Sequence, residues 1–184
     1  MDKKSKFNIH SFVSTFFYIG LIPKAPGTYG SIAAFPFVWI INKLIHLFFL
    51  DNPTQLDKGE ALSLMLYHLL FIIALFIIGV ITSDKYSRIT NKKDPKEVVI
   101  DEVVGQWLLF WLCAPGIQLI IDKVNDLIIC LIMLILFRIF DIIKPWPISV
   151  IDQKIRGGLG IMLDDIFAAI MGSIMFYAIV AILT

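Results

Sequence analysis

Charged residues are scarce in this chain of 184 residues: they make up 17% of it, whereas hydrophobic residues make up 58%. The mean hydropathy is correspondingly high, at +0.84. This balance excludes an ordinary soluble domain and predicts that lipid is the natural solvent of the chain. The net charge of +1 is too small to indicate a nucleic-acid partner, and we expect none.

Cysteine and histidine are also few. Cys113 and Cys130 both lie in apolar runs, without a C-x-x-C pair or a nearby histidine cluster, so neither a zinc site nor a disulfide framework is indicated. His46 and His68 lie inside apolar stretches and are interpreted as packing residues. The chain also lacks internal repeats, low-complexity tracts and linker-like segments, so we expect residues 1–184 to form a single membrane-embedded domain.

Long apolar stretches dominate what is present. Each approaches the roughly 20 residues that a helix needs to cross the hydrocarbon. The pattern predicts an all-α, polytopic membrane helical bundle with about five spans. A break at Pro115-Gly116, which would end the third helix near Ala114 and leave a short re-entrant piece, is an alternative for that span. The stretches are Ser31–Leu50, Ala61–Ile81, Val98–Ile121, Leu127–Ile143 and Ile166–Leu183.

The first segment, Met1–Ile22, begins with lysines and continues with apolar residues at helical spacing, while Asn8, Ser11, Ser14 and Thr15 fill the other face. No small-x-small cleavage site follows, which disfavours a cleaved signal peptide. We expect a helix that lies in the membrane interface.

Positive residues gather in alternate loops, whereas the other loops hold only Lys58 and Lys123. The positive-inside rule then places the N-terminus in the cytoplasm and Thr184 outside. The residues that carry this bias are Lys3, Lys4, Lys6, Lys24, Lys85, Arg88, Lys92, Lys93, Lys96, Lys144, Lys154 and Arg156. The charged segment from Asp84 to Glu97 is interpreted as a solvated loop.

Four polar segments stand at the ends of the predicted spans: 25–31, 100–105, 137–147 and 157–165. With the topology above, all four lie at the cytoplasmic face. Residues more than a hundred positions apart are thereby brought to one depth, which is what a site between the helices of a bundle requires.

Carboxylates are the main feature of these segments. They would repel one another within a few ångströms unless cations lie among them, and oxygen ligands without histidine or thiolate favour Mg2+. The candidate metal ligands are Asp101, Glu102, Asp141, Asp164 and Asp165. Simple helix capping is the alternative for the two acidic pairs, and an ion pair with Arg138 is the alternative for Asp141.

Phosphate has two kinds of anchor in this arrangement. Three helix N-termini would point into the site, with Thr28 and Ser31 at one and the glycine loop that includes Gly158 at another. Arg138, Lys144 and Arg156 would supply positive charge. The sequence therefore predicts a site for a phosphate ester of a lipid head group, although the hydroxyls could be plain N-caps and the glycines could serve only a turn.

Two other phosphatase chemistries lack their residues. Neither cysteine is followed six positions later by an arginine, and none of the four polar segments that form the predicted site contains a histidine to accept a phosphoryl group. Metal-activated attack on phosphorus is the mechanism that the residues support. Whether water or a carboxylate attacks stays open.

The four motifs are A-P-G-T-x-G-S at 25–31, I-D-E-x-x-G at 100–105, F-R-x-x-D-x-x-K-P-x-P-I at 137–148 and G-G-x-G-I-M-x-D-D at 157–165. Together they closely resemble the phosphatidylglycerophosphatase A family over nearly the whole chain. The resemblance implies an all-helical protein of the bacterial inner membrane that hydrolyses the phosphomonoester of phosphatidylglycerophosphate with Mg2+, in phosphatidylglycerol biosynthesis. It lends functional weight to Thr28, Asp101, Glu102, Arg138, Asp141, Lys144, Asp164 and Asp165, and less to Asp152.

One departure from the family pattern is visible. Ala168-Ala169 stands where the family has Ala-Gly, and the added methyl group bears on close helix packing rather than on the chemistry.

The leading hypothesis is therefore a Mg2+-dependent lipid phosphatase whose catalytic residues are Asp101, Glu102, Asp141, Lys144, Asp164 and Asp165. Its partners would be the phospholipid substrate and the membrane, with no obligate protein partner. The alternatives are a phosphatase for another lipid phosphate, a structural or assembly subunit, and a small cation or proton transporter. A transporter would be expected to place its ionisable residues near the middle of the bilayer.

Overall fold

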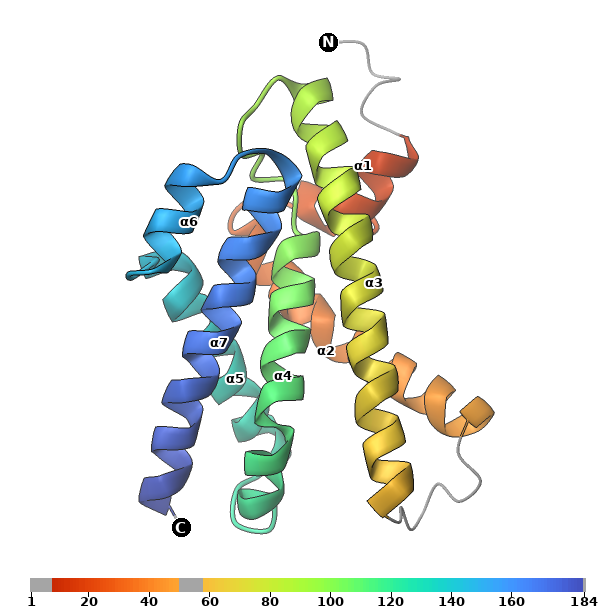
Figure 1. Cartoon of the computed structure of the whole chain (residues 1–184), viewed down its shortest axis with the longest axis vertical. Helices are drawn as coiled ribbons and strands as arrows, with labels where there is room; N and C mark the ends of the chain where they lie inside the picture. The colour runs from red at the N-terminus through yellow and green to blue at the C-terminus, as the bar shows by residue number, and fades with distance from the viewer. Residues whose placement is uncertain (1–7, 50–57, 184) are drawn as a thin grey trace.

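The computed structural model describes residues 8–49 and 58–183, and within them all regular structure is helical (Figure 1). This confirms the predicted all-α class. The helices are α1 (Ile9–Ser14), the 3-10 helix η2 (Ile19–Leu21), α2 (Pro26–Phe49), α3 (Lys58–Thr90), α4 (Ile100–Ile120), α5 (Asp126–Ile143), α6 (Ile148–Lys154) and α7 (Gly157–Leu183).

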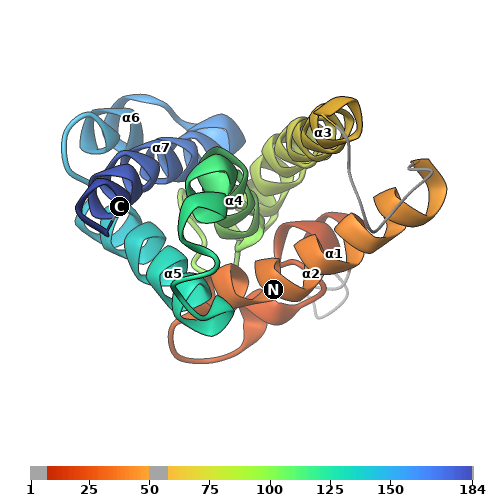
Figure 2. The same cartoon turned by 90° about the horizontal axis from the view of Figure 1, so that it is seen from below.

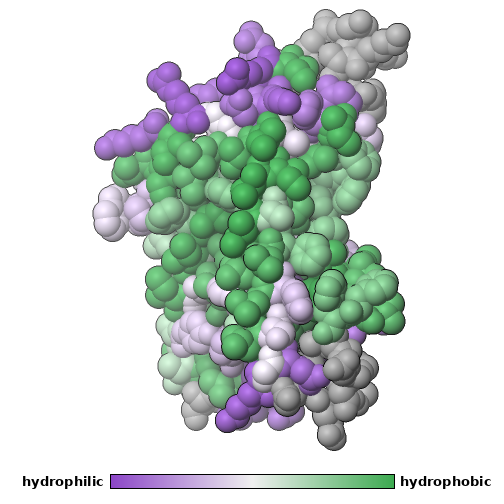
Figure 3. Space-filling model, turned by 45° about the vertical axis from the view of Figure 1, so that its right-hand side comes forward, coloured by the Kyte–Doolittle hydropathy of each residue, from purple (hydrophilic) through white to green (hydrophobic). Residues whose placement is uncertain are grey.

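Four of the described helices, α2, α3, α4 and α7, are long and apolar enough to cross a membrane. The predicted fourth span corresponds to α5, which has 18 residues and includes the charged residues Asp126, Arg138 and Asp141. Figure 3 shows an apolar band between two polar ends of the molecule, as expected for a membrane protein.

Three helices extend beyond the apolar stretches that predicted them. α2 begins at Pro26, α7 begins at Gly157, and α3 continues to Thr90. The first half of the segment interpreted as a solvated loop is therefore helical, with Asp84 and Arg88 forming an i,i+4 ion pair at 3.0 Å. Hydropathy detects only the part of a helix that lies in hydrocarbon, and polar turns can continue it into the interface.

The break considered at Pro115 does not occur, because α4 continues to Ile120 with Pro115 inside it. Proline removes one main-chain donor and weakens the turn before it. In that turn the carbonyl of Leu112 accepts a hydrogen bond of 3.0 Å from the hydroxyl of Tyr177 in α7. This bond ties the turn before the proline to a neighbouring helix.

Helix α4 lies at the centre of the bundle, and α2, α3, α5 and α7 pack around it (Figure 2). Its buried residues, which include Trp107, Leu109 and Cys113, join the two hydrophobic clusters of the core. Ala168 and Ala169 of α7 are both fully buried in the second cluster, so the packing accommodates the additional methyl group.

The N-terminal segment is anchored to the start of α4. The main-chain N–H of Val99 donates a hydrogen bond of 3.0 Å to the carbonyl of Ser14. The polar residues Ser11, Ser14 and Thr15 are buried against the protein, whereas Ile9 is exposed. This orientation suits a segment whose outer face meets lipid. Lys3, Lys4, Lys6 and Thr184, which contributed to the topology prediction, lie outside the described residues.

Candidate active site

A cavity of about 660 Å³ opens where α4 and α7 begin and α5 ends. All four of the polar segments singled out in the sequence contribute to its wall, so the predicted convergence is present in the structure. The charged residues that line it are Lys93, Asp94, Lys96, Asp101, Glu102, Arg138, Asp141, Lys144, Asp152, Arg156, Asp164 and Asp165.

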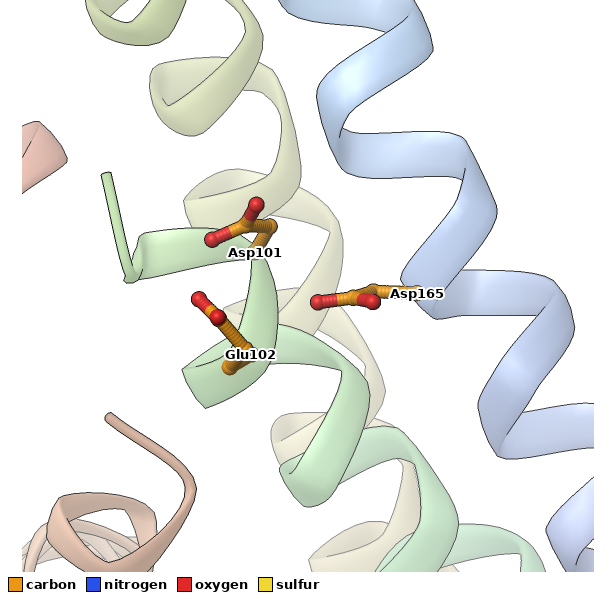
Figure 4. Close-up of side chains that lie close together, drawn as sticks. All are labelled: Asp101, Glu102 and Asp165. Atoms are coloured by element: carbon orange, nitrogen blue, oxygen red, sulfur yellow. The ribbon is translucent and has the colours of Figure 1, made fainter. Parts of the chain in front are cut away.

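Three carboxylates form the core of this site. Asp101 and Glu102 come from the first turn of α4, and Asp165 points toward them from α7 (Figure 4). One oxygen from each lies within 4.8 Å of the others. We call these three residues the carboxylate cluster. Their proximity follows from the close packing of α4 against α7 near Gly105, where a Cβ would lie 3.0 Å from the carbonyl oxygen of Asp165.

The carboxylate cluster fits a hard divalent cation. Oδ1 of Asp101, Oε2 of Glu102 and Oδ2 of Asp165 are buried and have no hydrogen-bond partner among the described residues. Buried carboxylate oxygens without partners are strongly disfavoured, and three together repel one another unless a cation or protons compensate. Oxygen donors without nitrogen or sulfur are the ligands that Mg2+ prefers.

The other two predicted metal ligands are paired with basic residues instead. Oδ2 of Asp141 lies 2.5 Å from Nη1 of Arg138, and the same nitrogen lies 3.7 Å from Oε1 of Glu102. The guanidinium therefore joins the end of α5 to the carboxylate cluster. All three side chains are largely shielded from solvent, which strengthens the interaction.

Lys144 makes the second basic bridge. It is the left-handed C-cap of α5, and its Nζ lies 2.9 Å from Asp152 of α6 and 2.5 Å from Asp164 of α7. Burial alone would lower the pKa of Lys144, but the hydrogen bonds and charges of Asp164 and Asp152 outweigh it and raise that pKa above its usual value. Lys144 is thus a fixed cation that fastens α6 to α7 beside the cavity.

Some of the predicted phosphate-binding residues line the cavity, and others lie outside it. Arg156 lines the cavity and is exposed. Thr28 and Ser31 lie just beyond the lining, and the hydroxyl of fully buried Ser31 donates to the carbonyl of Gly27 at 3.0 Å. Gly158 packs against α3, where a Cβ would collide with the carbonyl oxygen of Val80.

Gly27 is a site residue whose role the sequence did not reveal. A Cβ at this position would lie 2.8 Å from Nη1 of Arg138 and closer still to Oε1 of Glu102. Only glycine allows the first turn of α2 to approach this pair so closely. The glycine in the A-P-G-T motif could have indicated a close approach of the backbone. The reason for that approach is the pair opposite it, Glu102 and Arg138.

The loop between α3 and α4 was also missed. Lys93, Asp94, Pro95 and Lys96 all line the cavity, although their charges had indicated only a solvated loop. Deeper in α4, Gln106 is fully buried one turn below Glu102, and neither atom of its amide has a partner among the described residues.

These features define a class: a helical membrane protein with a carboxylate cluster that fits a hard cation, flanked by bridging arginine and lysine residues, at one end of its bundle. The phosphatidylglycerophosphatase A family model matches residues 12–180. The chain belongs to this family and is a phosphoric monoester hydrolase. A transporter or a purely structural subunit is not supported.

Curated relatives cover most of the chain. Phosphatidylglycerophosphatase A of Escherichia coli is 32% identical over 160 residues, which are 87% of this chain and 77% of that protein. Phosphatidylglycerophosphatase A of Haemophilus influenzae is 31% identical over 181 residues, covering 97% and 93% respectively. A candidate phosphatidylinositol-3-phosphatase of Bacteroides thetaiotaomicron is 31% identical over 163 residues, covering 89% and 88%. No solved structure matches the chain significantly.

Proposed function

We propose that this protein hydrolyses the phosphomonoester of phosphatidylglycerophosphate, giving phosphatidylglycerol and phosphate, and that it requires Mg2+. The observation that carries the proposal is the carboxylate cluster of Asp101, Glu102 and Asp165, whose oxygens lie within 4.8 Å of one another. Family membership supports the phosphatase chemistry, and two curated relatives carry the name of this activity.

Asp101, Glu102 and Asp165 would hold the cation. When bound, Mg2+ would neutralise the phosphoryl oxygens and activate a water molecule for attack. A phosphate group bound in the cavity would lie near Arg138, whose guanidinium forms ion pairs with Asp141 and Glu102. A preoriented cation of this kind stabilises negative charge that develops in the transition state without reorganisation.

The reaction is a hydrolysis, so its atoms balance with water alone. The water oxygen forms a bond to phosphorus, the bond from phosphorus to the glycerol oxygen breaks, and that oxygen gains a proton. A carboxylate that lines the cavity would accept a proton from the attacking water, and that proton would pass on to the glycerol oxygen that leaves. Lys144, held between Asp152 and Asp164, would contribute a fixed positive charge beside the site.

A second lipid phosphate is the competing substrate, because one relative of similar identity carries the name of a candidate phosphatidylinositol-3-phosphatase. The test is phosphate release by the purified full chain from phosphatidylglycerophosphate, phosphatidylinositol 3-phosphate and phosphatidate, each in the same detergent micelles. We expect the first to have the highest kcat/KM, by at least about tenfold. A higher value for either other lipid would replace the proposed substrate.

We also propose that the site faces the cytoplasm, in the inner membrane of a bacterium. The support is the gathering of positive residues at the end of the bundle that holds the cavity, including Lys93, Lys96, Lys144 and Arg156. A cysteine introduced at Lys93 should be protected from a membrane-impermeant maleimide in intact cells and should react after permeabilisation. Labelling in intact cells would reverse the proposed orientation.

A further inference from the structure

The loop between α3 and α4 has a defined shape over the cavity. The hydroxyl of Ser87 in α3 donates to the carbonyl of Lys92, and Nζ of Lys92 lies 2.6 Å from Oε1 of Glu97. Within the loop, the N–H of Val98 donates to the carbonyl of Pro95 at 2.9 Å, and Pro95 is buried. These contacts fasten both ends of the loop and its middle, so it forms part of the cavity wall.

Lys93 and Lys96 are the basic side chains that this loop contributes to the cavity lining. Both are exposed, and neither forms an ion pair with any residue in the ranges 8–49 and 58–183. Lys92 differs from them because Glu97 already neutralises it. The loop therefore brings to the cavity wall two lysines that form no ion pair with the described residues.

The charges of the cavity lining show why basic side chains without an ion-pair partner are important for binding a phosphate. Acidic side chains outnumber basic ones in the lining, seven to five. Two of the basic residues, Arg138 and Lys144, are already paired with carboxylates. A phosphomonoester adds nearly two further negative charges at neutral pH. Among the described residues of the lining, the cations left to meet it are Lys93, Lys96 and Arg156.

We propose that Lys93 and Lys96 form a cationic wall of the substrate site and bind the phosphomonoester dianion of the lipid head group. The inference rests on the proposed function, and it extends the site to a loop outside the family motifs quoted above. Flexible lysines at a cavity mouth act mainly on binding, because their attraction for the phosphate is similar in the ground state and in the transition state.

The test compares kcat and KM of the purified full chain with those of a Lys93→Ala/Lys96→Ala variant, using phosphatidylglycerophosphate in neutral detergent micelles at low salt. We expect KM to rise roughly fivefold with kcat within about twofold, and the difference in KM to shrink at high salt. Competitive inhibition by inorganic phosphate should weaken by a similar factor.

Three matched variants separate this role from a general effect of charge. Lys85→Ala removes an exposed lysine near the same end of α3 that does not line the cavity, and it should leave KM unchanged. Lys93→Arg/Lys96→Arg keeps both charges and should keep KM near that of the parent. Asp94→Asn removes the negative charge between the two lysines and should lower KM.

An unchanged KM in the double alanine variant, or an equal rise in Lys85→Ala, would overturn the inference while leaving the phosphatase function intact. If the parent releases phosphate from phosphatidate but not from phosphatidylglycerophosphate, the proposed substrate fails and the same comparison is made with phosphatidate. A parent chain that releases phosphate from no lipid would overturn the proposed function and this inference together.

Discussion

Two cavities of similar size occupy the two halves of this bundle, and they differ in how their polar groups are satisfied. The carboxylate cavity measures about 660 Å³, and a second cavity of about 760 Å³ lies among α2, α3 and α4. In the second, His68 contacts Asn42 at 3.2 Å and accepts a hydrogen bond of 3.1 Å from Trp107. Trp111 donates to the carbonyl of Met65 at 2.9 Å.

The polar groups of the second cavity thus pair with one another, whereas those of the first leave buried oxygens without partners. Membrane proteins tolerate internal polar groups when neighbouring helices satisfy them. Buried carboxylate oxygens without hydrogen-bond partners do not stabilise the bundle, so we expect them to have a functional role. In this molecule the candidate reactive site is therefore marked by clustered buried carboxylate oxygens without hydrogen-bond partners, and not by cavity volume.

The largest expected effect is a loss of turnover in the carboxylate cavity. Asp→Asn changes at 101, 141, 164 and 165 preserve the shape of the side chain but remove the charge that holds a cation or orients a basic residue. We expect each to lower kcat at least about 100-fold. Phosphate release by purified variants, with folding checked by size-exclusion chromatography, measures this.

Asp126→Asn is the matched control for these variants. Asp126 also lies in the first turn of a helix, α5, but it is far from the cavity lining. Its turnover should stay within about twofold of the parent. Near-normal turnover in three or more of the four cavity variants would show that these carboxylates serve helix stability and ion pairing rather than catalysis.

Gly27→Ala gives the next largest effect, through geometry rather than charge. The new Cβ would displace the carboxylate of Glu102 and the guanidinium of Arg138. We expect kcat to fall roughly 10- to 100-fold, because small displacements of reacting groups have effects of this size. Gly172→Ala is the control, since its Cβ would lie 3.3 Å from the end of the flexible Leu109 side chain. Equal effects of the two changes would contradict a special role for Gly27.

The second cavity should give the smallest effect on catalysis. His68→Ala leaves the indole N–H of buried Trp107 without its acceptor, which is expected to destabilise the fold by about 1–3 kcal/mol. Thermal unfolding in detergent should report this as a lower Tm, while kcat stays within about twofold. A loss of kcat comparable to that of Asp101→Asn would assign the second cavity to the reaction.

The sequence predicted which segments meet, because apolar length and loop charge determine the direction of each span. It could not predict how far each helix is rotated about its own axis. Asp164 and Asp165 illustrate the limit: adjacent helical residues point about 100° apart. The packing of α7 directs Asp165 into the carboxylate cluster and Asp164 toward Lys144. No pattern in the sequence distinguishes the two.

The sequence alone also could not reveal residues whose roles depend on a neighbour in space. Gly27 matters because Glu102 and Arg138 lie opposite it, and the 93–96 loop matters because Ser87 and Glu97 fasten it above the cavity. From its charged composition alone, this loop had been interpreted as solvated. The helical membrane class was easier to predict than these contacts, since it depends on sums over many residues.

Removal of the metal tests the central claim most directly. Purified protein should be treated with a chelator, and phosphate release from phosphatidylglycerophosphate should then be measured before and after addition of Mg2+. If Asp101, Glu102 and Asp165 hold a catalytic cation, activity will be lost in the chelator and restored by Mg2+, and Asp165→Asn will need more Mg2+ or fail to recover. Full turnover by the chelated, metal-free protein would contradict the account.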